Sequence, residues 1–205
     1  MPVERTVAVL VGSLRKESFN RKAAKAAASL APPHLKFEFL QIGDLPPYNE
    51  DAEGDQAPSL WTAFRDDVRR ADAVLFATPE YNRSAPGVLK NAIDVASRPY
   101  AQGALLNKPA AVMSVSTGQI GGFGANHHLR QMLAYLNMPT LGQPEMYLGP
   151  ASQLFGEGGE ILKESTRDLL KKFMQAFADW IETIAAEPID MTSEAGRGAQ
   201  QVSTH

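Results

Sequence analysis

Residues 7–20 decide the fold, and they read VAVLVGSLRKESFN. The first part, Val7 to Val11, is a short apolar run rich in β-branched residues that ends at Gly12. This pattern is typical of a strand that is buried on both faces of a parallel sheet. A helix is predicted to begin near Asn20, so the stretch reads as strand, polar loop and helix.

The loop between this strand and helix has the composition of an anion site. Ser13, Arg15 and Ser18 lie at positions i, i+2 and i+5. Two hydroxyls and a guanidinium can therefore converge, with the free backbone N–H groups of a helix N-terminus, on one dianion such as a terminal phosphate. The alternative is a solvated strand–helix turn in which Ser18 or Asn20 caps the helix. The loop taken alone leaves both interpretations open.

Composition limits the class of protein. The chain has 205 residues, 44% of them hydrophobic, which is enough for one sizeable core. A net charge of −3 with scattered basic residues argues against a nucleic-acid or anionic-membrane partner. Cysteine is absent, so electron chemistry requires a bound cofactor. No signal segment or membrane span is visible, and we expect a cytoplasmic protein with one domain at 1–187 and a disordered polar tail at 188–205.

The strand–loop–helix unit occurs twice more. Buried strands are predicted at 73–77 and 110–115, a half-exposed edge strand at 35–42 and a short strand around 145–148. Right-handed crossovers place the loops that follow parallel strands at one edge of the sheet. We therefore predict an α/β fold, a flavodoxin-like three-layer sandwich with a five-stranded parallel sheet in the order 2-1-3-4-5 and helices on both faces.

Helix-forming composition and apolar spacing account for most of the remaining chain. They predict helices over 20–30, 60–71, 88–96, 129–136 and 160–186. In the second of these helices, the apolar face is formed by Leu60, Phe64, Val68 and Ala71. Residues 43–58 form a long irregular excursion with a Pro-Pro pair and several acidic residues. Such length in a compact domain is typical of a functional segment or an oligomer contact, and the sequence leaves that choice open.

The other two loops are suited to a planar ligand. Residues 78–87 offer Tyr81 and Asn82, and residues 116–124 are rich in glycine, which lets backbone N–H groups approach a flat ring. A phosphate cradle beside two ring-lining loops is the arrangement expected for FMN in this architecture. No GxGxxG follows a strand and no GxxxxGK[ST] is present, which argues against a tightly bound dinucleotide or ATP.

The motifs resemble those of the NAD(P)H-dependent FMN reductases, which include bacterial chromate and quinone reductases. The resemblance covers roughly residues 7–184 and rests on GSLR with Ser18 and Asn20, and on TPEYNRSAPGVLKNAID at 78–94. It implies that the first loop binds the FMN phosphate and that the other two loops line the isoalloxazine. The residues so implied are Ser13, Arg15, Ser18, Phe19 through its backbone, Asn20, Pro79, Glu80, Tyr81, Asn82, Ser116, Thr117, Gly118 and Gly121.

The same resemblance implies an activity. FMN would pass hydride from the co-substrate NAD(P)H to small-molecule acceptors: quinones, free flavins or metal oxyanions such as chromate. No catalytic side chain is expected, because the cofactor carries the chemistry. Arg83 replaces an aromatic residue of some relatives, and we expect it on the substrate side, where it would attract an anionic acceptor or pair across an oligomer contact. A homodimer or homotetramer is implied, with Arg130 and Glu145 at positions used for intersubunit contacts; spacing alone makes both ordinary surface charges.

Two other functions stay open at this stage. A flavodoxin-type electron carrier would bind FMN without turnover of its own, although such carriers are usually strongly acidic and flank the ring with bulky aromatic residues. A flavin-binding regulatory or scaffold protein is the second alternative.

Several remaining residues receive ordinary structural interpretations. Adjacent side chains on a helix diverge, so His127 and His128 are not expected to share a metal ion, and no metal site is predicted. Trp61 and Trp180 are expected in the core.

Overall fold

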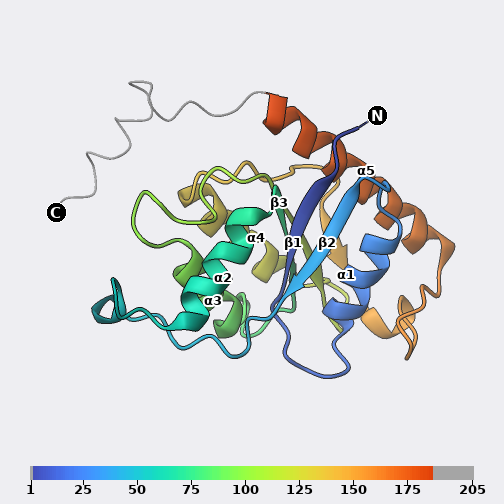
Figure 1. Ribbon diagram of the computed structural model, residues 1–205. Coiled ribbons are helices and arrows are strands. Elements are labelled where there is room, and N and C mark those ends of the chain that lie inside the picture. The colour runs from blue at the N-terminus through green and yellow to red at the C-terminus, as the bar shows by residue number, and fades with distance from the viewer. Residues whose placement is uncertain (1, 187–205) are drawn as a thin grey trace.

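The computed structural model describes residues 2–186, which form a parallel sheet between two layers of helices (Figure 1). The strands are β1 (Arg5–Val11), β2 (Leu35–Leu40), β3 (Ala73–Thr78), β4 (Ala110–Val115) and β5 (Met146–Leu148). All neighbouring pairs are parallel, and the order is β2-β1-β3-β4-β5. The predicted fold and strand order are confirmed, while the predicted tail at 188–205 lies outside the described residues.

Five α-helices cover the two faces of the sheet. They are α1 (Phe19–Ser29), α2 (Ser59–Arg70), α3 (Gly87–Ala96), α4 (Phe123–Tyr135) and α5 (Glu164–Ala186), with short 3-10 helices at Glu50–Ala52 and Ala151–Gln153. One hydrophobic cluster packs under α1 and α5, and a second packs under α2, α3 and α4. The last helix begins later than predicted because the chain first makes a turn closed by a bridge between Phe155 and Ile161.

The buried pattern of β1 has a direct structural cause. Val7, Val9 and Val11 contribute to the cluster on one side of the sheet, and Ala8 and Leu10 contribute to the cluster on the other. Because successive side chains in a strand point to opposite faces, a central strand with helices on both sides must be apolar throughout. The predicted double-sided burial of this strand is confirmed.

Some details differ from the sequence-based expectations. The edge strand β2 ends at Leu40, two residues early, and Ile42 turns into the core. Leu60 is 49% exposed although its spacing predicted a buried face; the adjacent Trp61 fills the interior position at 1% exposure. Trp61 is in the core as expected, whereas Trp180 is only partly buried and its Nε1 donates to the Pro139 carbonyl at 2.8 Å.

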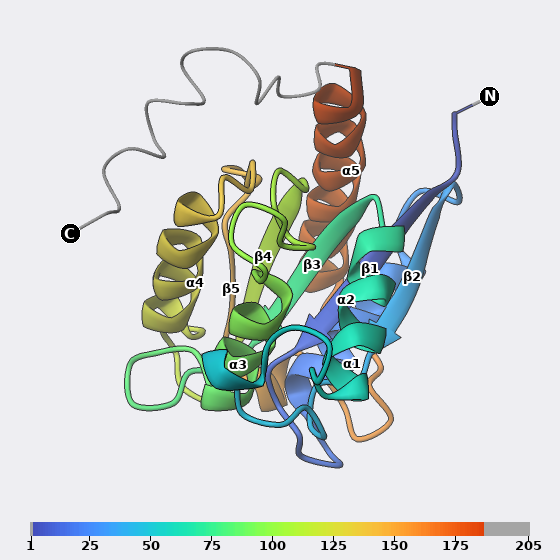
Figure 2. The ribbon, with the colours of Figure 1, turned by 60° about the vertical axis from the view of Figure 1, so that its left-hand side comes forward.

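Right-handed βαβ connections bring the loops after β1, β3 and β4 to the carboxyl edge of the sheet (Figure 2). The excursion at 43–58 follows β2 and reaches the same edge. The three predicted ligand loops therefore lie together, with the excursion beside them.

Candidate functional site

The first loop carries its polar side chains partly inward. Ser13 and Ser18 are 3% and 2% exposed. Ser18 is the N-cap of α1, and its Oγ accepts a hydrogen bond from the Arg21 N–H at 3.2 Å. The capping interpretation is therefore correct for Ser18. Its own O–H still offers a donor, because capping uses the hydroxyl as an acceptor.

Asn20 links α1 to the third loop. Its Nδ2 donates to the carbonyl of Val115, the last residue of β4, at 3.1 Å. Its Oδ1 is buried and has no hydrogen-bond partner within the described part of the chain. A buried acceptor of this kind is costly unless a ligand or water donates to it. The Asn20 amide is thus placed to accept from a ligand hydroxyl, while its backbone N–H and that of Phe19 lie in the helical turn that lacks intrahelical acceptors.

Arg15 supplies a positive charge that the protein does not neutralise. Its side chain is exposed and makes no ion pair among residues 2–186, whereas the nearby Glu17 pairs with Lys22 at 3.1 Å. The hydroxyl of Ser13 also has no partner in this range. Together with the positive end of the α1 dipole, these groups favour a bound anion.

Gly12 brings the first loop against the second. A Cβ at Gly12 would lie 3.0 Å from Leu89 Cδ2 and 3.4 Å from Pro79 Cδ. A side chain there would push the first loop away from α3, so the close approach of the two loops depends on glycine.

The second loop is a tight hairpin. The N–H and carbonyl groups of Tyr81 and Ser84 bond to each other in both directions at 3.0 Å. Asn82 and Arg83 have φ values of 52° and 65°, which is the pattern of a type I′ turn. The side chains of Tyr81, Asn82 and Arg83 are all exposed. Of the residues predicted to line the ring, Tyr81 and Asn82 are therefore presented outward on this turn, whereas Pro79 is buried and Glu80 is only partly exposed. Arg83, expected on the substrate side, is presented outward with them.

Glu80 joins this hairpin to α4. One carboxylate oxygen accepts from the N–H of Ala125 at 3.1 Å, and the other lies 3.3 Å from the guanidinium of Arg83. The N-cap of α4 is Gly122, which has no side chain to offer, so Glu80 satisfies an N–H that the helix itself leaves free.

Two further contacts that the sequence did not reveal fix the hairpin on α4. His128 Nδ1 lies 2.8 Å from Ser84 Oγ. A Cβ at Gly124 would lie 2.9 Å from both the Arg83 carbonyl and a Glu80 carboxylate oxygen. The only sequence signal was Gly124 itself, the last residue of the glycine-rich third loop at 116–124.

The third loop has an open part and a packed part. Ser116 Oγ accepts from the Gly118 N–H at 3.1 Å, and Thr117 and Gly118 are exposed. Gly121 instead is buried with φ of 65°, and a Cβ there would lie 2.6 Å from the carbonyl carbon of Tyr147. Gly121 is thus explained by packing against β5, and its predicted contact with the cofactor stays a prediction.

An aromatic rim lies beside this loop, formed by Phe123, His127 and Tyr147. The Tyr147 hydroxyl lies 3.0 Å from His127 Nε2. Burial, with a hydrogen bond to Glu145, raises the pKa of Tyr147 to about 12. His127 and His128 thus have different partners, and no group of three or more potential metal ligands occurs within residues 2–186.

Arg130 differs from its expected role as an ordinary surface charge. It is half-buried, its Nε donates to Asn126 Oδ1 at 3.0 Å, and its Nη1 donates to the Leu141 carbonyl at 2.9 Å. It therefore ties α4 to the segment that leads into β5.

The three loops provide what FMN requires. Unpaired donors at Ser13 and Arg15 suit a phosphate monoester, the orphan Oδ1 of Asn20 suits a ribityl hydroxyl, and open backbone at Gly118 suits a flat ring. Fold and site together define a flavodoxin-like, flavin-binding α/β protein. Within the described residues, no helix has the length and apolar character of a membrane span.

Comparison with known proteins narrows the class. The family model for NADPH-dependent FMN reductase matches residues 5–153, and the chain belongs to this family. A quinone reductase of Pseudomonas putida is 58% identical over 177 residues, covering 86% of this chain and 95% of the relative. A 2-hydroxy-1,4-benzoquinone reductase of a Burkholderia species is 46% identical over 175 residues, covering 85% and 95%.

A solved structure agrees with this assignment. FerB from Paracoccus denitrificans, described as a flavoenzyme NAD(P)H:(acceptor) oxidoreductase, superimposes with a TM-score of 0.82 at 45% identity and covers 87% of this chain and 98% of its own. The predicted family is confirmed, and with it the class of enzyme: an NAD(P)H-dependent oxidoreductase that uses FMN. Membership of this enzyme family favours an oxidoreductase over an electron carrier or a scaffold protein.

Proposed function

We propose that this enzyme reduces quinones with electrons from NAD(P)H at a flavin held by the loops after β1, β3 and β4. The observation that carries the proposal is the set of unpaired polar groups at Ser13 and Arg15 in the first loop and at Asn20 in the first turn of α1. They lie at the same sheet edge as the exposed parts of the other two loops. Relatives at 58% and 46% identity that are named as quinone reductases support the choice of acceptor. The protein acts in the cytoplasm, where its co-substrate is available.

The residues of the chain have binding and orienting roles. Ser13, Arg15 and Ser18 hold the phosphate with the first N–H groups of α1, and Asn20 accepts from the ribityl chain. When bound, FMN supplies two-electron transfer between NAD(P)H and an acceptor. The Tyr81–Ser84 hairpin is fixed before ligands arrive, because its backbone bonds and the Glu80 contact with α4 are already formed. A prepared site of this kind loses little entropy when substrate binds.

A direct test uses the purified protein with FMN. We expect flavin absorbance in the complex and oxidation of NADPH or NADH when benzoquinone is present. Steady-state rates with each nucleotide, measured with quinone, free flavin and chromate as acceptors, then give the preferred nucleotide and acceptor. A protein that binds no added FMN, or that oxidises neither nucleotide with any acceptor, would contradict the proposal.

Arg83 selects for anionic acceptors. Its side chain is 79% exposed, and its one ion-pair contact, with Glu80, is at 3.3 Å. Glu80 therefore compensates the positive charge of Arg83 only in part, and the exposed guanidinium can attract a ligand above the hairpin. A hydroxyquinone such as the substrate named for the Burkholderia relative is acidic and carries a negative charge near neutral pH.

Arg83→Gln tests this role by removing the charge while it keeps a long polar side chain. We expect KM for a hydroxyquinone anion to rise several-fold, with KM for a neutral quinone and kcat unchanged, and the difference should shrink as salt screens the charge. Arg69→Gln, an exposed residue of α2 that pairs with Asp66, is the matched control. Equal changes in KM for both quinones would exclude charge selection.

The outer face of α3 and α4 binds a second copy of the chain in a homodimer or homotetramer. A groove of about 350 Å³ runs between these helices, with Ile93, Met132 and Leu136 among its lining residues. At its border Tyr135 is 73% exposed, which is unusual for a large aromatic side chain. Sedimentation should report an oligomer, and Tyr135→Glu should shift it toward monomer. A monomeric parent protein at micromolar concentration would contradict the assignment.

A further inference from the structure

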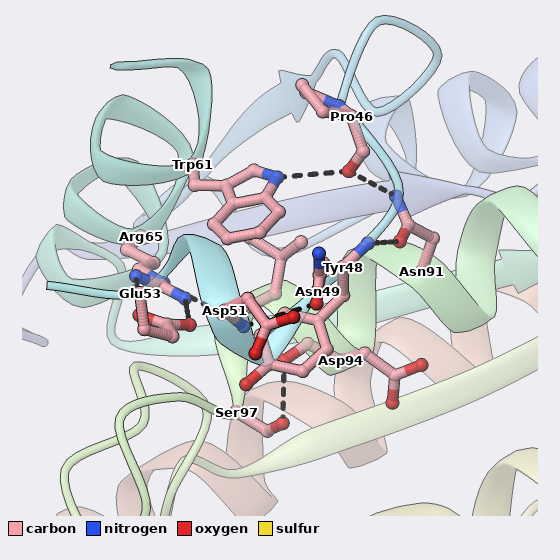
Figure 3. A network of polar contacts seen from close by, with 11 residues as sticks. Pro46, Tyr48, Asn49, Asp51, Glu53, Trp61, Arg65, Asn91, Asp94 and Ser97 are labelled. Atoms are coloured by element: carbon pink, nitrogen blue, oxygen red, sulfur yellow. Dashed lines mark hydrogen bonds and ion pairs between the residues drawn. The ribbon is translucent and has the colours of Figure 1, made fainter. Parts of the chain in front are cut away.

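The excursion at 43–58 is held in place by side chains from α2 and α3 (Figure 3). Asn91 on α3 makes three of these contacts. Its Oδ1 accepts from the Tyr48 N–H at 2.7 Å, and its Nδ2 donates to the carbonyls of Pro46 at 3.1 Å and Leu45 at 3.3 Å. An amide is suited to this position because it both donates and accepts.

Two residues of α2 complete what we call the clamp, which consists of Asn91, Trp61 and Arg65 (Figure 3). Trp61 Nε1 donates to the Pro46 carbonyl at 3.0 Å. Arg65 forms a two-point ion pair with Glu53 at 2.6 and 3.1 Å, and its side chain is only 6% exposed. The excursion is therefore bonded near its beginning, at Pro46, and in its middle, at Glu53, to helices that pack on the sheet.

The first loop has one close contact with α3 and one with the excursion that the clamp holds. Leu89, two residues before Asn91 on α3, lies against Gly12, where a Cβ would be 3.0 Å from Leu89 Cδ2. Gly43, at the start of the excursion, lies equally close to Leu14, since a Cβ there would be 3.0 Å from Leu14 Cδ2. The loop that carries the phosphate donors thus rests on α3 on one side and on the excursion on the other.

We propose that Asn91 is a positioning residue of the flavin site, which couples order in the excursion at 43–58 to FMN binding through the Gly43–Leu14 contact. This inference rests on the proposed function, because FMN is the ligand concerned. Coupling between two sites is reciprocal, so FMN must order the excursion as much as the clamped excursion favours FMN. A role in helix packing alone would affect stability and leave FMN affinity unchanged.

Affinity measurements separate these roles. FMN is titrated into apoprotein and followed by quenching of flavin fluorescence, for the parent chain and for Asn91→Ala, Asn91→Asp and Ile181→Ala. Ile181 is 1% exposed on α5, so its truncation lowers stability without touching the clamp. We expect Kd to rise on the order of tenfold in both Asn91 variants. We expect it to stay within about twofold of the parent in Ile181→Ala, as for an independent site.

Asn91→Asp also separates the two sides of the amide, because a carboxylate still accepts from Tyr48 but cannot donate to Pro46 and Leu45. If the Asn91 variants do not fold, Leu14→Ala removes the contact between the first loop and Gly43 instead. It should reproduce the loss of FMN affinity. An unchanged Kd in folded variants, with a fall in melting temperature like that of Ile181→Ala, would overturn the proposal.

Hydrogen exchange provides the reciprocal readout. FMN should slow exchange in residues 43–58 of the parent chain, and this protection should be lost in Asn91→Ala at saturating FMN. Protection confined to the loops after β1, β3 and β4 would overturn the coupling. A parent chain that binds no FMN at all would instead contradict the proposed function, so the two failures are distinct.

Discussion

The amino edge of the sheet and the first loop at its carboxyl edge differ in whether their polar side chains have partners. At the amino edge, Arg5 at the start of β1 forms two bonds with Glu182 of α5, at 2.8 and 3.1 Å. Asp72, just before β3, accepts from the Thr6 N–H at 2.7 Å and lies 3.6 Å from Arg5. Lys108, before β4, donates to backbone carbonyls at the end of α2. Each of these charged side chains therefore has a hydrogen-bond partner within the chain.

At the carboxyl edge, the first loop and the first turn of α1 leave comparable groups without partners, although Glu80 and Ser84 of the second loop are bonded to α4. Within residues 2–186, Ser13 and Arg15 have no partner for their side chains, and the buried Oδ1 of Asn20 has none either. Both edges consist of strand ends and loops of the same parallel sheet, so the difference does not follow from the fold class. The paired edge contributes to stability, and the unpaired edge is available to a ligand.

The largest expected effect comes from removing the unpaired donors. In the double variant Ser13→Ala, Arg15→Ala, FMN should lose two hydrogen bonds to a charged group, worth about 1.5–3 kcal/mol each. That corresponds to a rise in Kd of about 100-fold or more. The melting temperature of the apoprotein should not change, because neither side chain has a partner to lose. Titration and thermal unfolding measure both quantities, with Lys25→Ala on the exposed side of α1 as control.

A smaller effect on both affinity and stability is expected from Gly124→Ala. Its Cβ would meet the Arg83 carbonyl and a Glu80 carboxylate oxygen at 2.9 Å, so the hairpin and α4 must separate. We expect a loss of about 1–3 kcal/mol in the free energy of unfolding, as for overpacked sites, and weaker FMN binding. Gly142→Ala is the matched control, because nothing lies within 4 Å of a Cβ there. Identical affinities in the two variants would show that the hairpin does not need α4.

The smallest effect is expected at the paired edge. Glu182→Gln should lower the free energy of unfolding by less than about 1 kcal/mol, since the carboxylate is 41% exposed and solvent screens the pair. FMN affinity should not change. Glu38→Gln on the edge strand serves as the control. A clear loss of FMN affinity in Glu182→Gln would mean that the two edges are not independent.

The pH dependence of this variant has a defined sign. The hydrogen bond from Arg5 holds the pKa of Glu182 below its ordinary value of 4.5. The stability contributed by the pair is therefore present above about pH 4.5 and is lost as pH falls through the lowered pKa of the folded state. Unfolding measured at pH 7 and near pH 3 should show the difference between parent and variant shrinking in acid.

Much of the fold was predictable because burial leaves a local signature. The continuous apolar run of β1 reflects two covered faces, and the near-alternation in β2 reflects one. These patterns distinguish a central strand from an edge strand. The prediction that Leu60 is buried was wrong. Helical spacing identifies the apolar face of a helix but does not show at which residue that face first contacts the sheet. The adjacent Trp61 occupies that interior position.

The site was less predictable because its contacts are long-range. The sequence identified Ser18 as either a cap or a ligand, and the structure shows the cap. Nothing local indicated that Glu80 would bond to Ala125, 45 positions away, or that Asn91 would hold Pro46, also 45 positions away. Such contacts depend on how loops from different strands meet at one edge.

We propose above all that the unpaired donors of Ser13 and Arg15 at the carboxyl edge hold the phosphate of FMN. Titration of the apoprotein with FMN and with riboflavin, which has the same ring and ribityl chain without the phosphate, tests it most directly. We expect riboflavin to bind at least about 100-fold more weakly, the equivalent of two charge-assisted hydrogen bonds. Equal affinity for the two flavins would contradict the account.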